Sequence, residues 1–172
     1  MLISDEAAAT TSTVKKRGDR AFDYAILDQS SDQITVDGYL VAWQYFTRSA
    51  GTPCPSYAAV WRRLHNNQYR FQLVQSTLLP NQGFHSVNFY YHTNEVTRVK
   101  KGDCPSIFVN KDARPECSGN LVSFDSSAGN GLYGNHALLT NFGTPNFTFD
   151  APEQHQNRKL SIRPFVAGEF CS

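Results

Sequence analysis

The chain has no excess of charge and no long apolar run at its start. Its 16 lysines and arginines nearly balance 15 aspartates and glutamates, which leaves a net charge of +1. It therefore lacks the basic field that draws proteins onto nucleic acid or an anionic membrane surface. Residues 1–6 hold no apolar stretch long enough for a secretory signal or a membrane span. Nucleic-acid binding and membrane insertion are not expected.

Motifs for metal, redox and hydrolytic chemistry are also missing. The four cysteines form no C-x-x-C pair, and the five histidines show no H-x-H or H-x-x-x-H spacing, so no zinc or thioredoxin-like site is expected. No G-x-S-x-G nucleophile elbow is present. A glycosidase would need two carboxylates across a cleft, and Asp125 and Asp150 each end a predicted strand without a defined separation. We do not expect the protein to be an enzyme or to bind a cofactor. If it has an enzymatic activity, the class left open is a hydrolase.

Calcium is the one metal that remains open, because aspartates in turns can supply the oxygen ligands that it binds. No fixed loop spacing supports such a site, and solvated turn residues are the simpler interpretation. The aspartates concerned are Asp28, Asp32, Asp37 and Asp103.

The chain has no apolar repeat of helical period, and short β-type runs fill it from Ile34 to Val166. Aromatic residues, which favour pleated surfaces, make up 13% of the chain. About ten strands are predicted, separated by turns rich in glycine, asparagine and proline. The eleven runs that carry strand signals are 34–36, 39–46, 57–64, 69–74, 84–91, 95–99, 106–109, 121–125, 137–142, 146–150 and 159–166. We predict an all-β, two-sheet antiparallel β-sandwich of jelly-roll type, with an immunoglobulin-like sandwich as the alternative.

Two of these runs are informative in detail. Residues 39–46 are apolar on both faces, as in a central strand, and follow the turn dipeptide Asp37–Gly38. Residues 69–74 alternate with period two, so that Tyr69, Phe71 and Leu73 share one face. Both tryptophans, Trp43 and Trp61, lie within strands and are expected in the core.

The cysteines lie in the breaks between the predicted strands. Proximity favours a Cys104–Cys117 disulfide across a turn-rich segment, which leaves Cys54 to pair with Cys171. Four reduced thiols in a cytosolic protein are the alternative. A disulfide framework predicts an oxidising, secreted or extracellular setting, with a leader removed before residue 1.

The first 20 residues differ from the rest and predict an N-terminal arm or linker, followed by one domain over 21–172. Residues 7–14 could instead add as a strand to a neighbouring subunit. Arg17, Gly18 and Asp19 form the tripeptide that integrins bind, which coincidence in a charged linker also explains. Residues 15–17 could also be a dibasic processing site.

Asn146 begins an N-x-[ST] sequon and is a candidate glycosylation site. Tyr90, Tyr91 and Tyr133 are candidate surface aromatics, and aromatic rings beside polar groups suit sugars. The predicted loop 129–135 and its neighbour supply the candidate ligand residues Tyr133, Asn135 and His136.

Residues 38–46, 59–62, 69–74, 99–103 and 121–125 together resemble a loosely defined class of secreted jelly-roll modules of invertebrate extracellular multidomain proteins. Most members of that class have no assigned function. The resemblance covers about two thirds of the chain, implies fold and location, and carries over no functional residues. The sequence thus predicts a non-catalytic structural or adhesive module that assembles with other subunits, matrix proteins or further copies of itself. The alternative is a lectin-like module that binds glycans.

Overall fold

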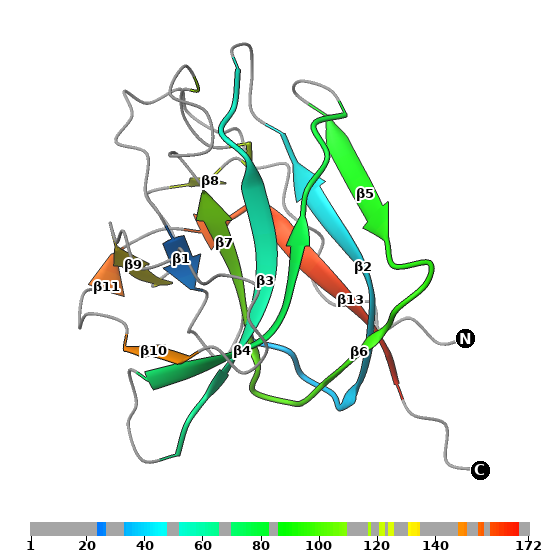
Figure 1. Ribbon diagram of the computed structural model, residues 1–172, viewed down its shortest axis with the longest axis vertical. Coiled ribbons are helices and arrows are strands. Elements are labelled where there is room, and N and C mark those ends of the chain that lie inside the picture. The colour runs from blue at the N-terminus through cyan, green and yellow to red at the C-terminus, as the bar shows by residue number, and fades with distance from the viewer. Residues whose placement is uncertain are drawn as a thin grey trace.

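The computed structural model describes a β-sandwich (Figure 1). It covers residues 24–26, 33–47, 52–65, 70–82, 86–109, 117, 121–122, 124–125, 131–134, 148–150, 155–156 and 159–168. The strands are β1 (Tyr24–Ile26), β2 (Gly38–Phe46), β3 (Ser56–Arg63), β4 (Arg70–Leu78), β5 (Val87–Tyr91), β6 (Thr97–Val99), β7 (Cys104–Val109), β8 (Phe124–Asp125), β9 (Gly131–Gly134), β10 (Thr148–Asp150), β11 (His155–Gln156), β12 (Lys159–Leu160) and β13 (Ile162–Gly168). No helix is present among these residues.

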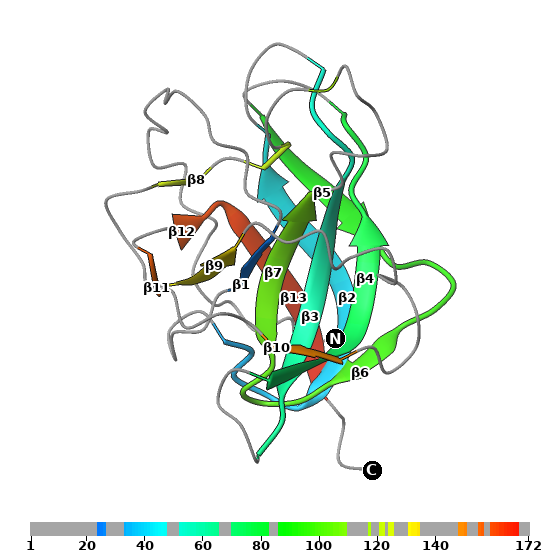
Figure 2. The same cartoon turned by 60° about the vertical axis from the view of Figure 1, so that its left-hand side comes forward.

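Two antiparallel sheets pack against each other, which confirms the predicted all-β sandwich. The larger sheet has the order β10-β4-β3-β7-β1-β9-β11, and the smaller has the order β13-β2-β5, with β6 also paired to β2. In Figure 2, β7, β3 and β4 lie in front of β2, β5 and β13. Strands β8 and β12 form a separate two-stranded ladder. The jelly-roll connectivity stays a prediction.

Strand β2 is the centre of the smaller sheet, as its apolar sequence predicts. It pairs with β13 on one side and with β5 and β6 on the other. Leu40, Trp43 and Tyr45 are fully buried and belong to the main core. Across the sandwich, that core also contains Val60 and Ile107 from β3 and β7. Burial of apolar area between the two sheets is the main stabilising contribution.

The larger sheet is buried on both faces where β3 and β7 lie side by side. All six residues of β7 are buried. Trp61, only 2% exposed, donates from Nε1 to Ser106 Oγ at 2.7 Å. Both tryptophans are thus buried as predicted. In β4, Phe71 and Leu73 are buried and Arg70 is exposed, which confirms the alternation where the structure describes it.

The predicted strand bounds are wrong in several places. Residues 34–36 form no strand; instead Ile34 bonds to the turn before β7, through Ile34 N to Asp103 O at 2.9 Å and Gly102 N to Ile34 O at 2.7 Å. Gly102 has a φ of 91°, as a tight turn requires. Strands β1, β9 and β11 were not predicted. The predicted arm 1–20 and strand 137–142 lie outside the described residues.

Candidate functional site

The predicted disulfides are wrong. The structure joins Cys54 to Cys117, 63 residues apart, instead of Cys104 to Cys117, and this excludes the Cys54–Cys171 pairing as well. Cys104 does not lie in a break but is the first residue of β7, where it is buried. Its thiol donates to Gly102 O at 3.6 Å and accepts from Gln33 Nε2 at 3.8 Å. Loop-closure entropy grows slowly with loop length, so proximity along the chain is a weak guide to pairing.

The other predicted site residues are scattered. Tyr133 lies in β9, opposite Ala25 in the ladder with β1, so part of the predicted ligand loop is a strand. Asp125 and Asp150 belong to different sheets, in β8 and β10. Asp37 and Asp103 are engaged otherwise: Asp37 Oδ1 accepts from Lys101 N at 2.8 Å, and Asp103 pairs with an arginine. Predicted sites outside the described residues are Arg17, Gly18, Asp19, Asp28, Asp32, Asn135, His136, Asn146 and Cys171.

A polar cleft opens where the edge of β4 lies opposite β5 and the segment that leads to β6. Its volume is about 570 Å³. The residues that line it, here called the polar cleft, are Gln75, Ser76, Thr77, Leu78, Tyr90, His92, Thr93, Asn94, Glu95 and Thr97. This cleft was not predicted, because its two walls come from different sheets that only the fold brings together.

Two side chains in the polar cleft have buried polar atoms without a hydrogen-bond partner: Gln75 Oε1 and His92 Nε2. The Gln75 amide is held by its nitrogen, which donates to Ser76 O at 3.1 Å and to Thr77 Oγ1. The His92 backbone donates to Val41 O at 2.9 Å, and its ring meets the Tyr90 ring edge-on, with centroids 5.2 Å apart. Burial lowers the pKa of His92 below its ordinary value, so the imidazole is neutral at neutral pH.

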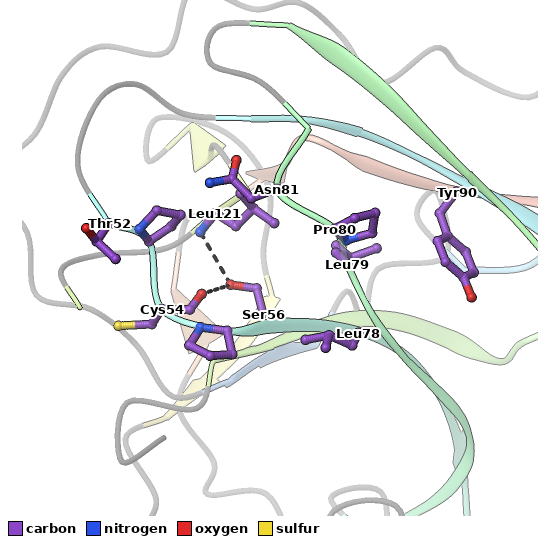
Figure 3. A pocket seen from close by; sticks show the side chains of 11 residues that line it. Thr52, Cys54, Ser56, Leu78, Leu79, Pro80, Asn81, Tyr90 and Leu121 are labelled. Carbon is purple, nitrogen blue, oxygen red and sulfur yellow. Dashed lines mark hydrogen bonds between the residues drawn. The ribbon is translucent and has the colours of Figure 1, made fainter. Parts of the chain in front are cut away.

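An apolar hollow of about 480 Å³ lies next to the polar cleft and shares Leu78 and Tyr90 with it (Figure 3). Figure 3 shows the two hydrogen bonds of Ser56 within this hollow: its Oγ donates to Cys54 O at 3.0 Å and accepts from Leu121 N at 3.3 Å. Pro53, Pro55, Leu79 and Pro80 also line it. The Ser56 hydroxyl is therefore already engaged within the protein, and we assign no ligand to this hollow.

The outer face of the smaller sheet is the second unusual surface. Its members, here called the aromatic face, are Tyr39, Val87, Phe89, Tyr91, Phe165, Arg98 and Arg163. Tyr91 is 64% exposed, and the Phe89 and Tyr91 rings stack with centroids 6.0 Å apart. Phe89 also meets Phe165 at 6.2 Å, and Arg163 Cζ lies 4.7 Å from the centroid of the Phe165 ring.

Strand β5 has the orientation opposite to the one its sequence favours. Alternation of apolar residues at 87, 89 and 91 would ordinarily place Val87, Phe89 and Tyr91 inward and Asn88 outward. Instead Asn88 is 7% exposed and donates to Thr47 Oγ1 at 3.1 Å, whereas Phe89 is 38% exposed. The fold therefore holds an amide in the interior and leaves aromatic side chains on the surface.

Comparison with protein-family models gave no match, and neither curated proteins nor solved structures showed a significant relative. Among the described residues, no group of three or more histidine, cysteine or acidic side chains could hold a metal ion. In the same part of the chain, no helix is long and apolar enough to cross a membrane. The function must be inferred from the surfaces themselves.

Proposed function

We propose that this protein is a non-catalytic, extracellular structural module that assembles with further copies of itself through the aromatic face. The observation that carries the proposal is the orientation of β5, which exposes Phe89 and Tyr91 while it buries Asn88. Aromatic residues and arginine are the side chains most enriched where proteins associate. In a sandwich that acted alone, the exposed rings of Phe89 and Tyr91 would not gain the free energy that burial of apolar surface gives.

Charge favours a head-to-tail contact between copies. Arg163 is a cationic member of the aromatic face, beside the Phe165 ring, and two faces of the same kind would bring these like charges together. The chain as a whole is nearly neutral, and the exposed carboxylates of Asp37 and Glu95 lie outside this face. A contact between the aromatic face of one copy and a different surface of the next, with a carboxylate such as Asp37 or Glu95, is heterologous, and such contacts build rings or filaments.

Sedimentation velocity over a concentration series at low and high salt tests the proposal. The natural protein is expected to associate, more strongly at low salt because the contact is partly ionic. A Phe89→Ser, Tyr91→Ser variant should remain monomeric. Leu78→Ser is the matched control, because Leu78 is 53% exposed but lies outside the aromatic face. A natural protein that is monomeric throughout the series would exclude assembly by this face.

The N-terminal arm and the sequon belong to the same proposal. The same sedimentation experiment on a variant without residues 1–20 tests whether the arm contributes to association. Unchanged association would show that the arm has no part in the contact. The mass of the protein from a secreting eukaryotic host, before and after enzymatic deglycosylation, tests Asn146. An unglycosylated Asn146 would weaken the extracellular assignment without affecting the contact.

The alternative function, binding of carbohydrate, is favoured by a different observation, the unpartnered polar atoms of the polar cleft. It does not require the aromatic face.

A further inference from the structure

The polar cleft lies beside a strand edge that is exposed. Strand β4 pairs with β3 along its length, but β10 covers its other edge only at Arg70–Gln72. Within the described residues, no second strand is paired with 74–78. Across the gap, β5 ends at Tyr91, and the segment 92–96 separates it from β6. The cleft is thus a gap between the edges of the two sheets.

Two hydrogen-bonding atoms in this cleft are buried without a partner. In native structures, such atoms are nearly always paired with protein, water or ligand, and an atom left unpaired destabilises the fold. Gln75 Oε1 is an acceptor, and neutral His92 Nε2 can donate or accept according to its tautomer. They come from different sheets, yet both line the same cleft. Both atoms are shielded from water, so a molecule with hydroxyl groups that enters the cleft could pair with them once the Gln75 and His92 side chains turn toward it.

The remaining lining residues restrict the class of ligand. Hydroxyls and an amide are supplied by Ser76, Thr77, Thr93, Asn94 and Thr97. Among the described residues that line the cleft there is no lysine or arginine and one carboxylate, that of Glu95, so an anionic ligand is disfavoured. Leu78 and Tyr90 add apolar surface for a C–H face.

From this chemistry we propose that the polar cleft binds a neutral saccharide, with Gln75 and His92 as the residues that position its hydroxyl groups. The volume of about 570 Å³ lies within the range of small-molecule sites. The described residues that line the cleft include no member of the aromatic face. They also do not include Tyr133, the one candidate ligand residue of the predicted loop that the structure describes.

The test uses the full chain against immobilised neutral oligosaccharides, with hexose, N-acetylhexosamine and fucose residues, beside sulfated and sialylated counterparts. Retention of a neutral member, followed by titration calorimetry with that saccharide, is the expected result. Preference for the sulfated or sialylated members would overturn the proposal, because these ligands would suit the arginines of the aromatic face instead. No retention by an intact fold would leave the cleft a water-filled gap and overturn it too.

The variants are chosen so that they should still fold, and a loss of saccharide binding can then be distinguished from a loss of structure. His92→Phe keeps a ring against Tyr90 and removes the unpartnered Nε2, so folding should be unchanged or improved while affinity falls about tenfold. Gln75→Leu removes the acceptor on the opposite wall and is expected to act in the same direction. Tyr91→Ser should leave saccharide binding unchanged while it disrupts association. Equal affinity in the natural protein and His92→Phe would refute the assigned role.

Discussion

Arg62 and Asp103 form a two-pronged ion pair that ties the end of β3 to the turn before β7. Arg62 Nε lies 2.9 Å from Asp103 Oδ1, and Nη2 lies 2.7 Å from Oδ2. Asp103 Oδ2 also accepts from Lys100 N at 2.8 Å. The hydrogen bond to Asp103 raises the pKa of Arg62. The Asp103 side chain is 2% exposed and the Arg62 side chain 31%. Without the pair, water could therefore solvate the guanidinium but not the carboxylate.

We expect Arg62→Leu to destabilise the fold more than Asp103→Leu does. The first variant leaves a buried carboxylate without its counter-ion, whereas the second leaves an arginine that water can reach. Breaking a buried pair costs about 3–5 kcal/mol, and the exposure of Arg62 places this one near the lower end. Urea unfolding of both single variants and the double variant measures the coupling. Additive losses would show that the pair contributes no interaction energy.

Gly38 and Gly168 face each other between β2 and β13, yet only one of them should resist substitution. A Cβ at Gly38 would overlap the backbone oxygen of Ala167, whereas a Cβ at Gly168 would meet nothing within 4 Å. Gly38→Ala should therefore cost about 1–3 kcal/mol through strain at the backbone. Gly168→Ala is the matched control and should be nearly neutral. Equal unfolding midpoints for the two variants would contradict the close approach.

These glycines also show where the sequence is a good guide and where it is not. Gly102 falls in the predicted turn between strands 95–99 and 106–109, and its positive φ agrees with that prediction, because turn chemistry is local. Gly38 was assigned to a turn with Asp37, but its role is close approach to a strand more than 120 residues away. The run 39–46 and the alternation at Phe71 and Leu73 were likewise predicted, since periodicity is local too.

The candidate sites could not be predicted, because their residues are distant in the sequence and come together only in the fold. Gln75 and His92 line one cleft because two sheet edges lie opposite each other, and no spacing along the chain encodes that gap. Phe89 and Tyr91 are on the surface because Asn88 finds Thr47 in the interior, a contact between residues 41 apart. Tyr91 was correctly considered a surface aromatic, but as a single residue and not as part of a face.

Cys104 should be chemically inert in the folded protein. Burial raises the pKa of its thiol to about 11, so little thiolate is present at neutral pH. We expect iodoacetamide to leave Cys104 unmodified at mildly alkaline pH and to alkylate it fully in guanidinium chloride, as read by peptide mass spectrometry. The same experiment checks connectivity, since a tryptic fragment with Cys54 joined to Cys117 should persist until reduction. A Cys104–Cys117 fragment would contradict the structure.

The stability of the fold should fall in mild acid because of His92. Burial lowers the pKa of His92 in the folded state, whereas the unfolded chain keeps a value of about 6.5. Between these two values the unfolded state binds more protons, so the contribution to stability is complete above the unfolded pKa and declines as pH falls toward the folded one. Urea unfolding at about pH 7.5 and about pH 5.5 should show a loss that is smaller in His92→Phe. His65→Phe, at an exposed position, is the matched control and should keep the full loss. An identical loss in His92→Phe and the natural protein would assign the acid sensitivity to other groups.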